Sequence, residues 1–326
     1  MREKRCYEDI LDVIGNTPMV RLNRITEGLT CAMYAKLEFL NPMGSAKDRI
    51  AKHLVEAAEK DGRLKPGDTI LENSSGNTAM GLALMAIQKG YKLTAVVRDR
   101  TSKEKLDQLK ALGVDVRKVD TSLPPEHPDS YNNITPRLAK ELPHCYFPDQ
   151  HNNRENNEAH YLGMGPEIWE QMDGRVDVLV AGMGTGGTIG GVGRFLKEKN
   201  PATKIVAVDV EGSIFTDYFR SGKLVKPAPY LLEGLGDEFL IGCADFSVID
   251  DMVQVSDRDA FHAARDLARR EGLLVGGSSG AVIHAALQVG RTLPPGSRMA
   301  IVFSDSASRY LSTIFNDEWM REKGLL

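Results

Sequence analysis

Four short stretches of the sequence combine residue types that could do chemistry together. The first is centred on Lys47, in the segment NPMGSAKDR that covers residues 41–49. Apolar residues at helical spacing follow it, so Lys47 lies at a predicted loop-to-helix junction. A desolvated lysine held among backbone N–H groups loses its proton more readily and becomes a nucleophile or a base. Because the chain has 41 lysines and arginines, this assignment depends on partners elsewhere.

The second stretch is rich in glycine, reads GMGTGGT over residues 182–188, and lies between a strand and a helix predicted from the sequence. Glycine allows positive φ and close approach to a ligand, and the N–H groups of a helix start favour an anion such as phosphate. The candidate phosphate-binding residues are Gly184, Thr185, Gly186, Gly187 and Thr188. The loop also fits G-x-G-x-x-G, with Asp209 about 20 residues downstream, which makes an NAD-dependent dehydrogenase the more distant alternative.

Two further loops each precede a predicted helix. Residues 74–78 read SSGNT, and their hydroxyls, amide and N–H groups either cap the helix or bind a carboxylate and a ring hydroxyl. Residues 276–280 read GGSSG, and Ser278 either caps a helix or offers its hydroxyl to a heterocyclic nitrogen. Together the four stretches match the needs of pyridoxal 5'-phosphate: a Schiff base, a phosphate anchor, oxygen contacts and a ring-nitrogen partner.

Alternating strands and helices position these loops. This spacing favours an α/β fold in which helices cover parallel sheets on both faces. Thr101 and Glu104 predict a capping box for one helix, and residues 121–130 resemble a surface loop. The predicted strands cover 19–22, 31–39, 69–72, 93–97, 115–119, 176–181, 204–210, 252–255 and 298–303. The predicted helices cover 47–62, 77–90, 102–112, 187–199, 257–270 and 279–292, and a further helix begins at 157.

Composition limits the classes of function. The chain has 326 residues, 42% of them hydrophobic, which is enough for two domains with their own cores. A net charge of -4 gives no electrostatic case for nucleic acid or an anionic membrane as partner. The apolar runs are too short to span a bilayer, and the N-terminus does not resemble a signal peptide, so we expect a cytoplasmic protein. The four cysteines are scattered, which predicts free thiols and no metal site.

In their order and spacing these motifs resemble the cysteine synthase and cystathionine β-synthase family of fold type II pyridoxal-phosphate enzymes. The resemblance begins at IGNTP, residues 14–18, runs nearly to the C-terminus, and favours the catalytic core of the cystathionine β-synthase branch. It implies two doubly wound, three-layer α/β domains like those of the tryptophan synthase β subunit. Residues 1–40 with 150–326 are then the larger cofactor-binding domain, and residues 41–149 the smaller, mobile substrate-side domain.

The resemblance also assigns site residues. It implies Lys47 as the Schiff-base lysine and catalytic base, Asn77 as the contact to the ring oxygen, and Ser278 as the partner of the pyridine nitrogen. Glu233 is assigned either to orient the amino group of the second substrate or, with equal weight, to form a salt bridge within its turn. The phosphate is assigned to Gly184, Thr185, Gly186, Gly187 and Thr188, and the substrate carboxylate to Ser74, Ser75, Thr78 and Gln150.

The implied reaction is β-replacement on serine, an activated serine or cysteine, through an aminoacrylate, with a thiol nucleophile. The alternatives within the family are an amine nucleophile and a β-elimination lyase. Four departures from the family pattern, at Asn73, Ser74, Asn157 and Asp237, are expected near the substrate side, where they bear on the choice of nucleophile. The partners expected are small amino-acid substrates and a second copy in a homodimer. Because the chain stops where some relatives continue into regulatory modules, we expect unregulated catalysis.

Overall fold

The computed structural model describes residues 6–123 and 127–326, and these form two compact units. The smaller unit comprises residues 6–15 and 41–149, and the larger unit residues 16–40 and 150–326. The sequence placed the whole N-terminal segment with the larger domain, whereas residues 6–15 belong to the smaller unit. The physical reason is that Leu11 is buried in the core of the smaller unit, and its carbonyl accepts a hydrogen bond from Lys52 Nζ at 3.0 Å.

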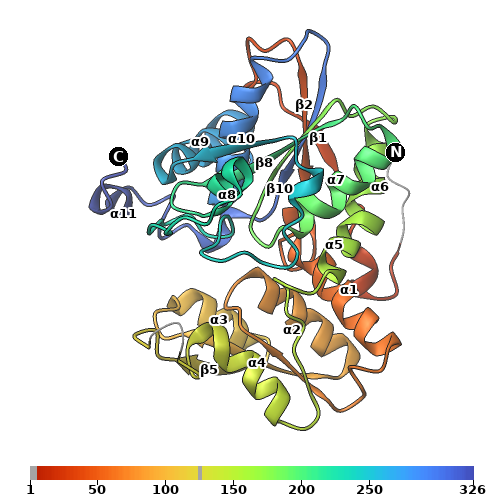
Figure 1. The fold of residues 1–326 in the computed structure, drawn as a ribbon, viewed down its shortest axis with the longest axis vertical. Helices are drawn as coiled ribbons and strands as arrows, with labels where there is room; N and C mark the ends of the chain where they lie inside the picture. The colour runs from red at the N-terminus through yellow and green to blue at the C-terminus, as the bar shows by residue number, and fades with distance from the viewer. Residues whose placement is uncertain (1–5, 124–126) are drawn as a thin grey trace. The chain divides into compact units, whose positions relative to one another are not determined.

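The larger unit is built on a six-stranded sheet with the order β1-β2-β10-β7-β8-β9, in which only the β1–β2 pair is antiparallel (Figure 1). Helices α9 and α10 pack on one face of this sheet, and α7, backed by α5 and α6, packs on the other. The strands are β1 (Met19–Arg21), β2 (Ala32–Leu37), β7 (Val178–Gly182), β8 (Lys204–Val210), β9 (Asp251–Val255) and β10 (Arg298–Phe303). The helices are α5 (Glu155–Ala159), α6 (Gly165–Gln171), α7 (Gly187–Lys199), α8 (Phe215–Ser221), α9 (Asp257–Glu271), α10 (Gly277–Gly290) and α11 (Asp317–Glu322).

The smaller unit has a four-stranded, fully parallel sheet with the order β5-β4-β3-β6. Side chains alternate between its two faces: Ile70 joins the core formed with α1, α2 and α3, whereas Leu71 packs with residues of α4. The strands are β3 (Thr69–Glu72), β4 (Lys92–Arg98), β5 (Asp115–Val119) and β6 (Cys145–Tyr146), and the helices are α1 (Lys47–Lys60), α2 (Asn77–Lys89), α3 (Lys103–Ala111) and α4 (Tyr131–Glu141).

The expected α/β class with parallel sheets is confirmed, but some local predictions were wrong or incomplete. Ser102, rather than Thr101, caps α3, because its Oγ accepts from the N–H of Lys105. Helix α4 was not predicted, and it contains Pro136 in its interior. A π-helical turn, His160–Met164, joins α5 to α6 and was also not predicted. Residues 124–126 of the predicted surface loop lie outside the described residues.

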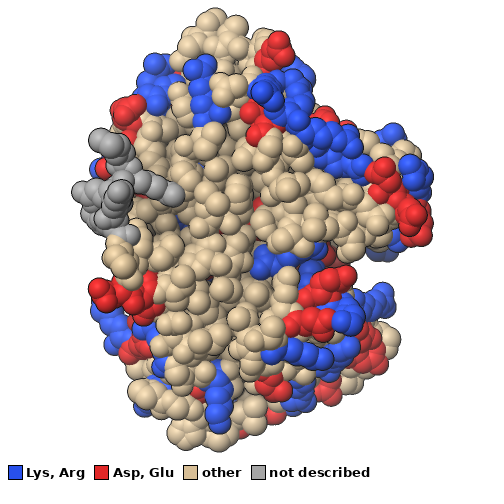
Figure 2. Space-filling model, turned by 180° about the vertical axis from the view of Figure 1, so that it is seen from behind, with Lys and Arg blue, Asp and Glu red and all other residues tan. Residues whose placement is uncertain are grey.

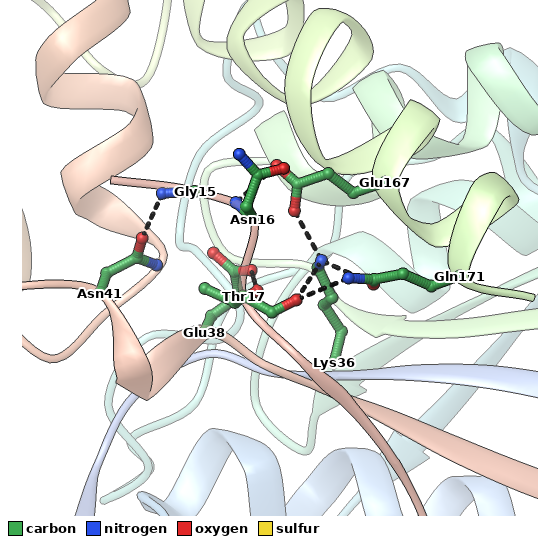
Figure 3. Close-up of polar contacts among 8 residues, drawn as sticks. All are labelled: Gly15, Asn16, Thr17, Lys36, Glu38, Asn41, Glu167 and Gln171. Atoms are coloured by element: carbon green, nitrogen blue, oxygen red, sulfur yellow. Dashed lines mark hydrogen bonds and ion pairs between the residues drawn. The ribbon is translucent and has the colours of Figure 1, made fainter. Parts of the chain in front are cut away.

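A buried lysine fixes the first turn of the larger unit (Figure 3). Lys36 is fully buried, and its Nζ donates to the carbonyl of Thr17 at 2.7 Å, to Glu167 Oε2 at 2.5 Å and to Gln171 Oε1 at 2.9 Å. Glu167 also accepts from the N–H of Asn16, so β2, α6 and this turn are held by one ion-paired network. Within the smaller unit, the N–H of Gly15 donates to Asn41 Oδ1.

Charge is mixed on the face drawn in Figure 2, where Lys and Arg side chains lie among Asp and Glu. No helix among the described residues has the length and apolar character needed to cross a membrane. Within the same residues, no three His, Cys, Asp or Glu side chains gather in a way that could hold a metal ion.

Candidate active site

Lys47 is the first residue of α1 and follows the loop after β2. Its backbone N–H donates to Ser45 Oγ at 3.2 Å, and no side chain caps the helix. Asp48, in the first turn, is buried and accepts from the N–H of Met43 at 2.6 Å, which closes the loop over the helix start. The half-buried lysine is therefore presented from a fixed backbone.

The loop before α2 carries most of the predicted substrate contacts. The N–H of Gly76 donates to Ser74 Oγ at 3.2 Å, Thr78 is buried, and no side chain caps α2. One turn further along, a Cβ on Gly81 would lie 3.0 Å from the carbonyl oxygen of Lys47, so α1 and α2 pack very closely. The smaller unit thus brings the starts of these two helices together, and with them the predicted residues Lys47, Ser74, Ser75, Asn77 and Thr78.

In the larger unit, the glycine-rich loop joins β7 to α7. Gly186 caps α7 with φ of 80°, and the helix start has neither a side-chain cap nor an acidic residue in its first turn. Thr185 Oγ1 accepts from Asn156 Nδ2 at 3.0 Å and from the N–H of Gly187 at 3.5 Å, which leaves its hydroxyl hydrogen available to donate. Uncapped N–H groups with a hydroxyl donor form a site suited to a phosphate.

Two asparagines of α5 lie behind this loop. Asn156 Oδ1 lies 1.9 Å from the position of a Cβ on Gly187, and Asn157 Nδ2 lies 2.6 Å from that of a Cβ on Gly190. Asn157 was expected near the substrate side, and the structure places it against the glycine-rich loop instead. Sequence reasoning did not assign a role to Asn156, because the contact depends on the close packing of α5 on α7. His160 Nε2 also lies 3.3 Å from Thr188 Oγ1, and sequence reasoning assigned this histidine no role.

The turn that carries Glu233 packs against the same loop. The N–H of Gly236 donates to the carbonyl of Met183 at 2.9 Å, and a Cβ on Gly184 would lie 2.3 Å from the carbonyl oxygen of Gly234. Glu233 also lines a small cavity of about 50 Å³ whose wall includes Gly277, the residue before Ser278. This turn is therefore adjacent to both the glycine-rich loop and the serine loop.

Ser278 lies in the first turn of α10 with its side chain buried. Its hydroxyl forms no hydrogen bond with any described residue, whereas the neighbouring Ser279 Oγ accepts from the N–H of Ser304 at 3.1 Å. Ser278 keeps 7% of its surface exposed, so its hydroxyl is open to a bound heterocycle with a ring nitrogen. The structure thus distinguishes Ser278 from Ser279, which the sequence pattern alone does not.

Asp305 and Tyr310 support the serine loop and were not singled out as site residues. The N–H of Gly276 donates to the carbonyl of Asp305 at 3.1 Å, and the Tyr310 hydroxyl donates to Asp305 Oδ2 at 2.8 Å. Burial, with Asp305 close by, raises the pKa of Tyr310 well above its usual value, so the phenol stays a neutral donor. Only the position of Asp305, two residues after the end of β10, could have pointed to this contact.

Gln150 is buried, and its backbone lies close to the phosphate loop. Its carbonyl accepts from Asn156 Nδ2 at 2.7 Å, and the same Nδ2 donates to Thr185 Oγ1. The larger unit therefore brings together the glycine-rich loop, Gln150, Glu233 and Ser278.

Asp209 does not support the dehydrogenase alternative. The side chain is fully buried, and its Oδ2 accepts from the N–H and the hydroxyl of Thr216 at 2.9 and 2.8 Å. Burial raises the pKa of this carboxyl above its usual value. Because the carboxylate binds the start of α8, it is not presented to a ribose hydroxyl as the dinucleotide fingerprint requires.

The residues present fit pyridoxal 5'-phosphate. The uncapped glycine-rich loop suits the phosphate, the unpartnered hydroxyl of Ser278 suits a ring nitrogen, and Lys47 is a half-buried lysine on a fixed backbone. Helix starts commonly carry a side-chain cap, and the start of α7 lacks one, so a role in the fold alone does not explain this loop.

Comparison with known proteins gives a consistent result. Residues 10–305 match the family model described as "Pyridoxal-phosphate dependent enzyme". The chain is 44% identical over 327 residues to cystathionine beta-synthase of Mus musculus, which covers 100% of this chain and 58% of the relative. It is 44% identical to the cystathionine beta-synthase of Apis mellifera, in a match that covers 98% of this chain and 63% of the relative. It is 38% identical to that of Saccharomyces cerevisiae, in a match that covers 97% of this chain and 64% of the relative. The chain thus spans about three fifths of the length of these relatives, and it belongs to the family of pyridoxal-phosphate dependent enzymes.

Proposed function

We propose that this chain catalyses β-replacement on serine, an activated serine or cysteine, with a thiol as the nucleophile, as in a cystathionine β-synthase or cysteine synthase. The observation that carries the proposal is the hydroxyl of the largely buried Ser278, which has no hydrogen-bond partner among the described residues. It lies in the same unit as a glycine-rich helix start without an N-cap side chain, in a chain that has a lysine at another helix start. The relatives named cystathionine beta-synthase, matched over nearly the whole of this chain, support the same reaction class.

The proposal gives each residue a task. Bound pyridoxal phosphate supplies an electron sink that makes the Cα proton of an amino acid acidic and its β-substituent a leaving group. Lys47 holds the cofactor and then accepts the Cα proton at its Nζ. The neutral hydroxyl of Ser278, unlike a carboxylate, does not hold a proton on the ring nitrogen, and this favours prompt loss of the β-substituent. Asn77 contacts the ring oxygen.

The remaining assignments concern the phosphate and the substrates. The glycine-rich loop, from Gly184 to Thr188, binds the phosphate through backbone N–H groups and hydroxyls. The substrate carboxylate is bound by Ser74, Ser75, Thr78 and Gln150. Glu233 orients the amino group of the second substrate. We assign cofactor binding mainly to the larger unit and mobility on the substrate side to the smaller one.

An absorption spectrum of the purified protein tests the proposal. We expect a visible band from the lysine-bound cofactor, and its absence after reconstitution with pyridoxal phosphate would overturn the assignment. Serine, O-acetylserine, phosphoserine and cysteine are then added in turn to find which one changes the band. Sulfide, cysteine and homocysteine are tested as nucleophiles. Release of pyruvate without a second substrate would instead identify a β-elimination lyase, and turnover with an amine would identify the amine alternative.

We also propose that the chain works as a cytoplasmic homodimer. The four cysteines are all described and none forms a disulfide, which suits a reducing compartment. Sedimentation of the purified chain at several concentrations tests the dimer, and fractionation of the source cells tests the compartment.

A further inference from the structure

Asn157 reaches the glycine-rich loop through space that Gly190 leaves open. Its Nδ2 lies 3.0 Å from the carbonyl oxygen of Cys243 and 3.5 Å from that of Gly186. A Cβ on Gly190 would lie only 2.6 Å from this nitrogen, so any larger residue there would displace the amide. The Asn157 amide therefore occupies the space that the missing side chain of Gly190 leaves.

One of the two carbonyls that Asn157 contacts, that of Gly186, shares a peptide plane with an N–H group that could donate to the phosphate. Gly186 is in the left-handed region, and its carbonyl also accepts the first hydrogen bond of α7, from the N–H of Gly190 at 2.9 Å. The peptide bond is planar, so fixing the carbonyl of Gly186 also fixes the direction of the N–H of Gly187. That N–H lies at the start of α7, where it makes a long contact with Thr185 Oγ1 at 3.5 Å.

The oxygen of the Asn157 side chain argues against a role in stability alone. Asn157 Oδ1 is buried and has no hydrogen-bond partner among the described residues. A buried acceptor without a partner lowers the free energy of unfolding, so an apolar residue at this position would stabilise the fold at least as well. The amide is therefore explained by what its Nδ2 does for the loop.

Resting on the proposed function, we propose that Asn157 is a positioning residue for the phosphate of the cofactor. It joins the peptide plane between Gly186 and Gly187 to Cys243, and thereby keeps the loop N–H groups directed at the phosphate before it binds. Because the loop is fixed in advance, less ordering accompanies binding, and the affinity for phosphate-bearing ligands rises. Asn157 does not touch the ring or the reacting atoms in this assignment.

Comparing pyridoxal phosphate with pyridoxal, which lacks the phosphate, isolates this role. The full-length wild-type chain and the N157A variant are stripped of cofactor and titrated with each compound, and the visible band of the lysine adduct reports binding. We expect N157A to lower the affinity for pyridoxal phosphate about tenfold, the effect of one hydrogen bond of typical strength, and to leave the affinity for pyridoxal unchanged. Equal losses for the two compounds, or no loss for either, would overturn the proposal.

An isosteric variant keeps the test independent of cavity formation. N157D has the same shape but places a carboxylate against two carbonyls beside an anion site, so we expect a larger loss of pyridoxal phosphate affinity than in N157A. Wild-type affinity in N157D would contradict the proposal. If a stripped variant does not stay folded, loss of pyridoxal phosphate from the loaded protein is timed, and N157A is expected to release it about tenfold faster. An unchanged release rate would again contradict it.

A matched control lies at the other end of α7. Thr203 is fully buried in the same unit, and its Oγ1 donates to the carbonyl of Val176 at 2.8 Å. T203V removes one buried hydrogen bond of the same kind, and we expect it to keep the wild-type ratio of the two affinities. A changed ratio in T203V would show that the ratio reports general stability. Failure of the wild-type chain to bind either compound would instead overturn the proposed function itself.

Discussion

The loops before α7 and α2 hold equivalent positions, each between a parallel strand and an uncapped helix, but they are built differently. The loop before α7 is crowded: a Cβ on Gly186 would lie 2.7 Å from the carbonyl oxygen of Cys243, and one on Gly187 would lie 1.9 Å from Asn156 Oδ1. The loop before α2 has space, since a Cβ on Gly76 would meet nothing closer than Ser74 Oγ at 4.0 Å. This difference suits the roles proposed for the two loops, a fixed anchor for the cofactor before α7 and an adaptable loop for substrates before α2.

The largest expected effect is on the chemistry that the smaller unit provides. K47A should abolish the visible band and lower turnover by about a thousandfold or more, because it removes both the attachment point and the base. The control is K52A, since Lys52 lies on the same helix and its Nζ donates to the carbonyl of Leu11. A visible band in K47A with near-normal turnover would place the cofactor lysine elsewhere.

The next prediction concerns one ion pair in each unit, and urea unfolding measures the free energy that each pair contributes. K36M in the larger unit should cost about 3 kcal/mol, because it leaves Glu167 partly buried without its cation. K89M in the smaller unit removes the pair of Lys89 with Glu59, whose side chains are about a quarter exposed, and should cost about 0.5 kcal/mol. Similar costs for the two variants would show that the larger unit is not the more tightly fixed one.

Adding one methyl group to each loop probes the crowding directly. G187A should cost about 1–3 kcal/mol in the free energy of unfolding and weaken binding of pyridoxal phosphate, since the Cβ would overlap Asn156. G76A should leave cofactor affinity unchanged, because its Cβ meets open space and its backbone φ is negative. Thermal unfolding with and without cofactor measures the stability and the cofactor binding of both variants. A large loss of stability in G76A together with none in G187A would reverse the comparison.

The smallest effect concerns pH and the far ends of α1 and α2. The Tyr91 hydroxyl donates to Glu59 Oε1, and burial together with this carboxylate raises the pKa of Tyr91 to about 12. Since the folded pKa is raised, the associated stability is present below pH 10 and is lost as the pH rises through about 12. Y91F should be less stable at pH 7 by about 1 kcal/mol and should approach the wild type between pH 10 and 12. Parallel melting curves across that range would contradict this.

Much of the fold follows from patterns that are local in the sequence. The strands at 69–72, 115–119, 204–210 and 298–303 have the predicted bounds, and all but the mostly charged strand at 115–119 are short runs rich in β-branched or apolar residues. Lys47 and the glycine-rich loop could be found because their chemistry depends on residue type and on position before a helix. The assignment of roles to these residues remains a proposal.

What the sequence did not predict depends on packing between distant segments. Pro136 inside α4 hid that helix, because proline normally ends a helical pattern. Asn157 was misplaced because its partners, Gly186 and Cys243, are far from it in the chain. Residues 6–15 were assigned to the wrong unit because a single buried leucine, Leu11, decides where they pack.

The close contact between Gly190 and Asn157 couples two positions that are 33 residues apart in the chain. A Cβ at 190 would come within 2.6 Å of Asn157 Nδ2, so any larger residue at 190 would have to move the end of that side chain. A substitution within α7 would therefore act on the glycine-rich loop through Asn157, although residue 190 itself lies outside that loop.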